Sequence, residues 1–286
     1  MYDVTIIGAG PAGISASLYT KRANLKTLVI DNYQTSLEKA EKIENYYGFE
    51  NGINGKDLYN TGKKQAKNLE IDILEEEVLE IKKEEIFNIK TTKREIKSKT
   101  VILATGNKKK TPTIKGIKEF EGKGISYCAI CDGFFYRGKD VAVLGNGNYA
   151  INETLELINI AKTVTILTNG DTAPEIREEN VVINPKKIKE IHGENKVEKI
   201  EFEDNTKMDI SGIFVAEGVA GSSDFAKKIG AMVEKQNIIV NEEMSTNIEG
   251  LYACGDCTGG LLQVSKAVYE GTKAGLSAIQ YIRKIN

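Results

Sequence analysis

Two cysteines, Cys128 and Cys131, are separated by two residues near the middle of the chain. Cysteines at this spacing can close a small disulfide ring, and the partner sulfur and nearby dipoles lower the pKa of one of the two thiols. Exchange with another disulfide needs such a thiolate, together with a leaving thiol of lower pKa. The pair therefore predicts a reversible two-electron redox site.

A dinucleotide-binding fingerprint begins the chain. Residues 3–7 have a buried-strand pattern and lead into Gly8-Ala9-Gly10-Pro11-Ala12-Gly13, after which the residues have helical spacing. This strand–turn–helix order is the context in which G-x-G-x-x-G marks a dinucleotide site. Gly8 permits the tight turn, Gly10 lets the backbone approach a pyrophosphate, and Gly13 lets helix and strand pack closely. The helix N-terminus adds N–H groups and a partial positive charge.

The next strand pattern, at residues 27–30, ends at Asp31. An acid at this point can accept hydrogen bonds from ribose hydroxyls, and it repels a 2′-phosphate. FAD or NAD therefore fits the first site better than NADP does.

A second unit of the same kind follows the cysteine pair. A strand pattern at residues 140–144 leads into Gly145-Asn146-Gly147-Asn148-Tyr149-Ala150, and a helix at 151–160 and a strand at 163–167 come next. The redox pair thus lies, in sequence, between two predicted nucleotide sites. This order suggests that electrons pass from a bound cofactor to the disulfide.

Length and composition are those of a globular protein with room for two domains. The 286 residues are 41% hydrophobic and 28% charged, with a formal net charge of −2, so neither nucleic acid nor an anionic membrane is indicated as a partner. The longest apolar runs are strand-length and too short to span a membrane. The four cysteines are too few for a secreted disulfide scaffold, and the cytoplasm is the expected location.

The motifs, taken in this order, resemble the low-molecular-weight thioredoxin reductases, which are flavoproteins with two dinucleotide-binding domains. The residues that carry the resemblance are the first fingerprint, Glu44-Asn45-Tyr46, residues 102–106, the segment 128–136, and Gly255-Asp256 with Gln263. The resemblance implies an α/β fold of two Rossmann-like domains of the three-layer ββα type. Residues 1–111 and 237–286 would form a discontinuous FAD-binding domain. Residues 112–236 would form a redox-dithiol domain that resembles an NADPH-binding domain.

The same resemblance implies where FAD binds. Asp256 would lie near the ribityl chain and Asn45 near the isoalloxazine ring. Gln263 and Val264 would lie beside the flavin. The full set of expected FAD contacts is Gly8, Gly10, Pro11, Ala12, Gly13, Asp31, Asn45, Val78, Ala104, Thr105, Gly106, Gly255, Asp256, Gln263 and Val264. The chain departs from the family at residues 32–42, where a charged stretch replaces a glycine-rich loop.

Roles at the redox site also follow from the resemblance. Cys131 would be the thiol nearest the flavin, and Cys128 the thiol that attacks the disulfide of thioredoxin or a thioredoxin-like protein. Asp132 would be the acid/base residue, a role that suits its position because the accepting sulfur of a reduced pair needs a proton. The alternative for Asp132 is an Asx-turn or a helix cap after the motif.

The second site departs from the family at the residues that read NADPH. The family has a histidine-arginine-arginine run and a later arginine after the second strand, whereas this chain has Leu167-Thr168-Asn169-Gly170-Asp171-Thr172 and no basic residue before Arg177. A 2′-phosphate needs charge-assisted donors. The chain is therefore most similar to the ferredoxin-dependent flavin thioredoxin reductases, whose electron donor is reduced ferredoxin, a small acidic iron–sulfur protein. Lys108-Lys109-Lys110 is either a docking patch for that donor or a solvated loop.

Other functions stay open at this stage. The first alternative is an ordinary NADPH-dependent thioredoxin reductase. The second is a thioredoxin-reductase-like ferredoxin–NADP reductase, a group that generally lacks the cysteine pair. The third is a flavin-bound redox sensor or regulatory protein without turnover. Members of the family are commonly homodimers, which is the expectation here.

No metal site is expected. Cys254 and Cys257 flank the proposed flavin-binding Gly255-Asp256, where a metal would compete with FAD. These two cysteines are interpreted as small packing residues. His192, the single histidine, is interpreted as structural.

Overall fold

The structure is a computed structural model that describes residues 1–33, 35–106, 112–218, 220–234 and 236–285. The chain divides into two compact units: unit 1 comprises Met1–Lys108 and Gly221–Asn286, and unit 2 comprises Lys109–Ala220. Each unit has its own sheet and its own buried core. The first unit is therefore discontinuous in sequence, as predicted.

The chain returns to unit 1 at Gly221, earlier than the expected return at residue 237. Helix α5 (Ser222–Ile229) accounts for the difference, because it packs against strand β4 (Val78–Lys83) of unit 1. Its first residue, Ser222, also exchanges hydrogen bonds with Thr105. The expected first crossing begins at Thr111, which lies outside the described residues.

The main sheet of unit 1 has the strand order β3-β2-β1-β6-β5-β4, and β17 also pairs with β6. The parallel strands are β1 (Tyr2–Ile7), β2 (Thr27–Asp31), β3 (Asp72–Glu75), β6 (Glu95–Leu103) and β17 (Leu251–Ala253). Strand β5 (Phe87–Thr91) joins β4 and β6 in antiparallel pairing. The parallel strands are rich in apolar and β-branched residues, which is typical of strands buried on both faces.

The register of these strands creates the binding edge. Ile7 pairs with Ile30 on one side and with Leu103 on the other, so the carboxyl ends of β1, β2 and β6 lie at one level. Ligands of open α/β sheets bind outside the carboxyl ends of the strands. The residues that follow these strands are therefore placed for binding.

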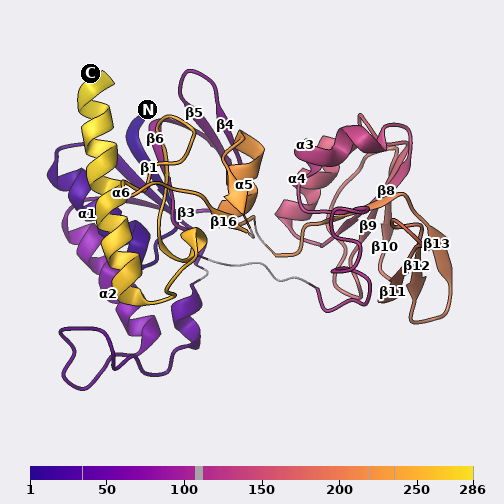
Figure 1. The fold of residues 1–286 in the computed structure, drawn as a ribbon, viewed down its shortest axis with the longest axis horizontal. Coiled ribbons are helices and arrows are strands. Elements are labelled where there is room, and N and C mark those ends of the chain that lie inside the picture. Colours follow the sequence, from indigo (N-terminus) through magenta and orange to yellow (C-terminus); the bar gives the residue numbers. More distant parts are fainter. Residues whose placement is uncertain (34, 107–111, 219, 235, 286) are drawn as a thin grey trace. The chain divides into compact units, whose positions relative to one another are not determined.

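The helices of unit 1 lie beside the sheet (Figure 1): α1 (Pro11–Arg22), α2 (Gly55–Asn68) and α6 (Val264–Ile285). Helices α1 and α6 approach closely because α6 has a glycine at the contact. A Cβ atom on Gly271 would overlap the carbonyl oxygen of Ala12. Side chains of both helices and of the sheet, including Ile6, Val29 and Ala274, form one core.

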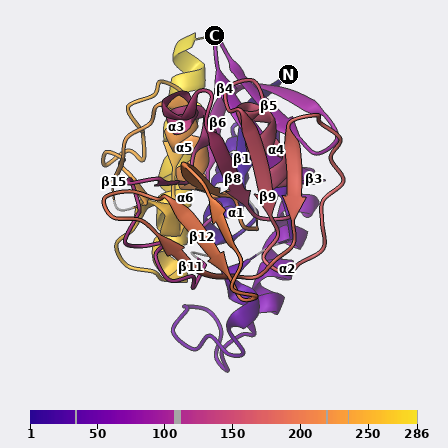
Figure 2. The same cartoon turned by 90° about the vertical axis from the view of Figure 1, so that its right-hand side faces the viewer.

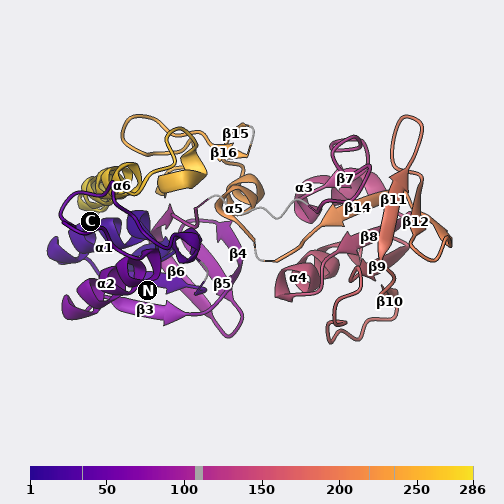
Figure 3. The ribbon, with the colours of Figure 1, turned by 90° about the horizontal axis from the view of Figure 1, so that it is seen from below.

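The sheet of unit 2 has the order β10-β9-β8-β14-β7, with parallel pairing throughout its described strands. These strands are β7 (Ile125–Ser126), β8 (Asp140–Leu144), β9 (Thr163–Leu167), β10 (Val181–Asn184) and β14 (Gly212–Val215). Figure 3 shows the strands of this sheet in that order. Helices α3 (Ala129–Asp132) and α4 (Asn148–Leu157) pack on each other. The predicted second strand–turn–helix–strand unit is confirmed.

A small antiparallel sheet completes unit 2, where a strand-rich insert is predicted. It consists of β11 (Ile188–His192), β12 (Lys199–Phe202) and β13 (Lys207–Asp209), and Figure 2 shows β11 and β12 side by side. The remaining short elements of the described chain are η1 (Ser36–Lys39), η2 (Gly133–Tyr136), η3 (Gly255–Thr258), β15 (Val233–Glu234) and β16 (Asn237–Ile238).

Candidate active site

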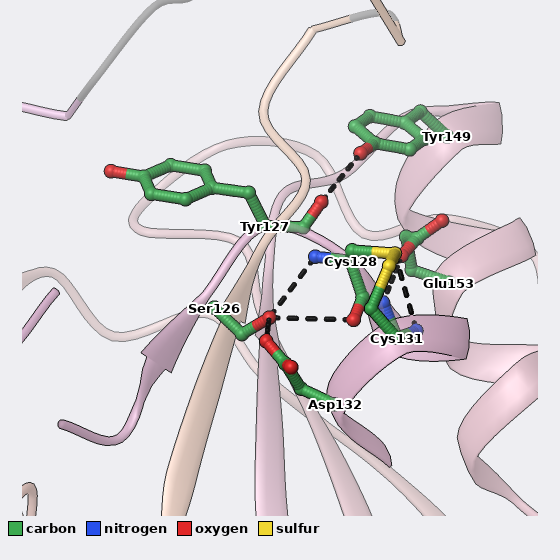
Figure 4. Close-up of a disulfide and its surroundings, with 8 residues drawn as sticks. Ser126, Tyr127, Cys128, Cys131, Asp132, Tyr149 and Glu153 are labelled. Atoms are coloured by element: carbon green, nitrogen blue, oxygen red, sulfur yellow. Dashed lines mark hydrogen bonds between the residues drawn. A yellow bond between two sulfur atoms is a disulfide. The ribbon is translucent and has the colours of Figure 1, made fainter. Parts of the chain in front are cut away.

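The two cysteines of the redox motif are joined in a disulfide, as their spacing predicts (Figure 4). Strand β7 delivers the chain to Cys128, which is the N-cap of the short helix α3. The backbone N–H of Cys131 donates to Cys128 Sγ at 3.2 Å. Such a donor favours a thiolate on Cys128. Cys128 is 3% exposed, whereas Cys131 is exposed, so a partner reaches the Cys131 side of the disulfide more easily in this structure.

Asp132 is held beside the disulfide by Ser126, which sequence reasoning missed. The Ser126 hydroxyl donates to Asp132 Oδ2 at 2.6 Å and accepts from the backbone N–H of Cys128 at 3.1 Å. Asp132 precedes helix η2, but its side chain does not cap that helix. The acid/base role of Asp132 stays a prediction. The signal available in the sequence was a serine two residues before Cys128.

A second acid reaches the motif from helix α4. Glu153 Oε2 accepts a hydrogen bond of 2.8 Å from the backbone N–H of Ala129, between the two cysteines. Tyr149, one helical turn earlier, donates to the carbonyl oxygen of Tyr127 at 3.3 Å. These two contacts attach the redox motif to the helix that follows the second fingerprint.

Exposed apolar side chains follow the disulfide closely in sequence. Phe134 and Phe135 are 68% and 69% exposed, and Ile130 between the two cysteines is also exposed. The Arg137 guanidinium lies over the Phe134 ring, 5.4 Å from its centroid. Exposed aromatic rings beside a reactive centre are typical of a surface that binds another protein.

The glycines of the first fingerprint occupy the positions that their roles demand. Gly8 has φ +111°, and a Cβ atom there would overlap the carbonyl oxygen of Ala104. A Cβ atom on Gly13 would overlap the carbonyl oxygen of Gly8. Gly10, the N-cap of α1, has nothing within 4 Å of its ideal Cβ position. The turn is therefore closed on the sheet side and open at Gly10, in front of the N-terminus of α1.

The C-terminal motif lies beside this turn. An ideal Cβ atom on Gly255 would be 3.0 Å from Ala12 Cβ, and the Gly255 N–H donates to Glu270 Oε2 at 2.8 Å. Lys266 pairs with Glu270 at 3.1 Å. Asp256 is partly buried, and burial raises the pKa of its carboxyl group. The Gly255-Asp256 loop is thus fixed to α6 by two side chains, Lys266 and Glu270, that sequence reasoning missed.

Other expected cofactor residues are also brought together across long stretches of chain. The side chain of Asn45 donates to Gln263 Oε1 at 2.9 Å. Thr105 and Ser222 exchange hydrogen bonds between the backbone N–H of each and the hydroxyl of the other. Val78 is buried at the start of β4. In the strand order, β4 and β3 are at opposite ends.

The sequence pattern of the pyridine nucleotide-disulphide oxidoreductase family matches residues 2–271. A thioredoxin reductase of Bacillus subtilis is 35% identical over 304 residues, which cover 100% of this chain and 96% of that protein. The chain belongs to this family.

Solved structures of thioredoxin reductases have the same fold. The atypical thioredoxin reductase TRi from Desulfovibrio vulgaris Hildenborough has a TM-score of 0.92 and 38% identity, with 99% of each chain covered. A ferredoxin-flavin thioredoxin reductase from Clostridium acetobutylicum has a TM-score of 0.72 and 34% identity, covering 99% of this chain and 98% of that one. The protein is a flavoprotein disulfide reductase of the thioredoxin reductase type, and FAD is its cofactor.

The residues of this thioredoxin reductase-type protein fit FAD. The open space at Gly10 and the N-terminus of α1 suit a pyrophosphate. Pro11 and Ala12 follow β1, and Gly106 follows β6, at the same edge of the sheet. Because Asn45 and Gln263 are hydrogen-bonded to each other, they are placed to act together on one ligand. The individual FAD contacts stay predictions.

Asp31 ends β2 as expected, but its carboxylate is already engaged. It is 2% exposed, and its Oδ2 accepts from Lys63 Nζ at 2.6 Å and from the Tyr59 hydroxyl. Burial and the Asp31 carboxylate raise the pKa of Tyr59. The Tyr33 N–H donates to the other oxygen, Oδ1, at 3.0 Å. The predicted ribose contact therefore has to be made by a carboxylate that already holds three donors.

The second fingerprint keeps its backbone form in this reductase. Gly145 has φ +151°, and Gly147 is the N-cap of α4. After β9, the Asn169 side chain is used within the protein, because its Oδ1 accepts from the backbone N–H of Ile188. Lys186, the next lysine along the chain, pairs with Asp204 at 2.8 Å. Residues 167–172 after β9 therefore include no lysine or arginine, and the lysine side chain that lies beside this loop is that of Lys187, next to Gly170. Lys108-Lys109-Lys110 lies outside the described residues.

The second cysteine pair does not form a metal site among the described residues. Cys254 and Cys257 are buried free thiols. Burial raises the pKa of Cys254 and raises that of Cys257 to about 11. The burial of the two thiols and their raised pKa values agree with the interpretation of Cys254 and Cys257 as packing residues. Within the described chain, no helix has the length and apolar character of a membrane span.

The burial of these thiols predicts a thiol count. The native oxidised protein should have no thiol that reacts with Ellman's reagent at pH 8, because the thiolate forms of Cys254 and Cys257 are disfavoured and shielded. Unfolding the oxidised protein in guanidinium should expose two reactive thiols. Fast labelling of either residue in the native protein would contradict this assignment.

Proposed function

We propose that this chain reduces the disulfide of thioredoxin or a thioredoxin-like protein, and that its electron donor is reduced ferredoxin rather than NADPH. The observation that carries the choice of donor is the end of β9, where residues 167–172 include no lysine or arginine. Asn169 in that loop is bonded to Ile188. The structural similarity to the ferredoxin-flavin thioredoxin reductase of Clostridium acetobutylicum supports the same choice.

The free energy of the missing hydrogen bonds to a 2′-phosphate supports this choice of donor. A hydrogen bond to a charged group contributes about 1.5–3 kcal/mol. Two such bonds to a 2′-phosphate are worth about 3–6 kcal/mol, which corresponds to ~10²–10⁴ in affinity. A site without them discriminates poorly in favour of NADPH. The backbone fingerprint alone would hold only the pyrophosphate.

The redox motif supports the transfer to a partner disulfide. When bound, FAD supplies the two electrons that open the Cys128–Cys131 disulfide. One thiolate of the reduced pair then attacks the partner's disulfide, forming one sulfur–sulfur bond and releasing the partner's other sulfur. The second cysteine displaces the partner and re-forms the Cys128–Cys131 bond. In this proposal Asp132, which is held by Ser126, gives or takes the proton of the sulfurs.

The assignment of the two thiols is part of the proposal. The resemblance to the family assigns attack on the partner to Cys128, and the Cys131 N–H that points at Cys128 Sγ supports a thiolate there. Cys131, however, is the more exposed residue in this structure. Phe134, Phe135 and Ile130 offer the partner an apolar surface around the pair. The homodimeric state and the cytoplasmic location stay predictions.

A donor assay tests the proposal. We expect thioredoxin reduction to proceed when reduced ferredoxin is the donor. When NADPH is the donor, we expect a kcat/KM at least ~100-fold lower than the kcat/KM of a typical efficient enzyme. Saturation by micromolar NADPH would contradict the choice of donor and leave the reductase function intact. Reduction of the flavin without turnover of any thioredoxin would instead favour the redox-sensor alternative.

A further inference from the structure

Glu153 is a buried acid to which the redox steps above assign no role. It is 1% exposed on helix α4, and its carboxylate accepts the 2.8 Å hydrogen bond from Ala129 N–H (Figure 4). That N–H belongs to the peptide group that directly follows Cys128. A carboxylate from a separate helix is thus attached to the backbone of the redox motif.

The hydrogen bond alone does not require an acid. The Ala129 N–H lies in the first turn of α3, where backbone donors lack partners within the helix. A glutamine oxygen would satisfy this donor equally well, and burying it would cost less than burying a carboxylate. A glutamate differs from a glutamine here in that it can carry a negative charge, within one peptide group of Cys128.

A negative charge on Glu153 opposes the effect of the Cys131 N–H on the pKa of the thiols. The Cys131 N–H at Cys128 Sγ favours a thiolate, whereas a nearby negative charge disfavours one. Asp132 is the other acid at the motif, and it is bonded to Ser126. Tyr149 is a neighbouring phenol, and its hydroxyl donates to the carbonyl oxygen of Tyr127. Under α4, strands β8 and β9 contribute mainly buried apolar residues.

We propose that Glu153 is a positioning residue of the redox dithiol, which fixes the Cys128–Ala129 peptide and places a negative charge beside the sulfurs. Its charge raises the pKa of the reduced pair, so that both sulfurs stay protonated over more of the pH range. Reduction of the disulfide by two electrons then takes up two protons, one on each sulfur. Without the charge, one sulfur remains a thiolate over more of the pH range, and one proton is taken up. The proposal rests on the redox role of Cys128 and Cys131, and it holds for either electron donor.

The pH dependence of thiol reactivity tests the proposal. The holoenzyme is reduced with a phosphine, freed of reductant without oxygen, and alkylated with iodoacetamide between pH 5.5 and 10. Labelling of Cys128 and Cys131 is followed by mass spectrometry of their peptide. In Glu153→Gln, we expect the midpoint pH of alkylation to fall by about one unit, because the repelling charge is gone. Glu156→Gln removes the same charge from the same helix and should leave the midpoint unchanged.

A charge-retaining variant separates the electrostatic role from a structural one. Glu153→Asp keeps the charge and shortens the side chain, so its midpoint should stay near that of the wild type. An unchanged midpoint in Glu153→Gln, or equal shifts in the Gln and Asp variants, would overturn the proposal. Because glutamine keeps the acceptor for Ala129, a Glu153→Gln protein that does not fold would also overturn it. Reduction is chemical here, so the outcome is independent of donor and of thioredoxin turnover.

Discussion

Replacing Cys128 or Cys131 by serine is expected to lower thioredoxin reduction by at least ~10³-fold, because residues that act as one covalent unit fail together. Neither variant can form the disulfide seen in the structure. FAD content should be unchanged, since the fingerprint glycines belong to unit 1 and the pair belongs to unit 2. Steady-state turnover and the flavin-to-protein ratio measure the two effects.

The second cysteine pair provides the matched control. A serine hydroxyl at position 257 could keep the hydrogen bonds that Cys257 Sγ makes to the carbonyl oxygens of Leu103 and Cys254. Cys257→Ser should therefore retain turnover within ~3-fold. Turnover that survives in Cys128→Ser, or is lost in Cys257→Ser with the fold intact, would refute the assignment of the redox pair.

The serine variants also decide which thiol attacks the partner. A variant that keeps the attacking thiol and lacks the resolving one should accumulate a stable mixed disulfide with thioredoxin. Accumulation in Cys131→Ser would assign the attack to Cys128, and accumulation in Cys128→Ser would assign it to Cys131. Non-reducing electrophoresis separates these products.

Gly10→Ala is expected to remove FAD binding while leaving the protein folded. Gly10 has φ −72°, and its ideal Cβ position is open, so alanine is tolerated in the polypeptide itself. The added methyl group would occupy the space through which a pyrophosphate approaches the backbone. We expect FAD affinity to fall at least ~10-fold, measured by fluorescence titration of the apoprotein, with little change in the Tm of the apoprotein.

Gly13→Ala is the contrasting variant. Its Cβ atom would overlap the carbonyl oxygen of Gly8, so helix α1 has to move away from the sheet. Overpacking of this kind costs about 1–3 kcal/mol or more, and the Tm of the apoprotein should fall. Wild-type FAD affinity in Gly10→Ala would show that the pyrophosphate does not approach at this glycine.

Local spacing was sufficient to predict the motifs. The strand–turn–helix contexts of both fingerprints and the short ring between Cys128 and Cys131 depend on residues close in sequence. The fold class followed from the resemblance to a family that these motifs carry. The structure agrees with each of these predictions because the interactions that determine them are short-range.

The supporting contacts could not be predicted from spacing. Asn45 meets Gln263 only because β17 and α6 return to the sheet after unit 2. Lys63 and Tyr59 reach Asp31 from helix α2. The bonds between Thr105 and Ser222 likewise depend on how α5 packs. Such contacts follow from tertiary packing, which a single sequence leaves open, and they also account for the earlier return at Gly221.

Anaerobic flavin spectroscopy tests the electron path most directly. The holoenzyme is mixed with reduced ferredoxin or with NADPH, the flavin absorbance band is followed, and oxidised thioredoxin is then added. We predict that ferredoxin bleaches the flavin, that NADPH does not, and that thioredoxin restores the colour in the wild type but not in Cys128→Ser. Rapid bleaching by NADPH would contradict the proposed donor. Recovery of colour in the cysteine variant would contradict the path through the Cys128–Cys131 pair.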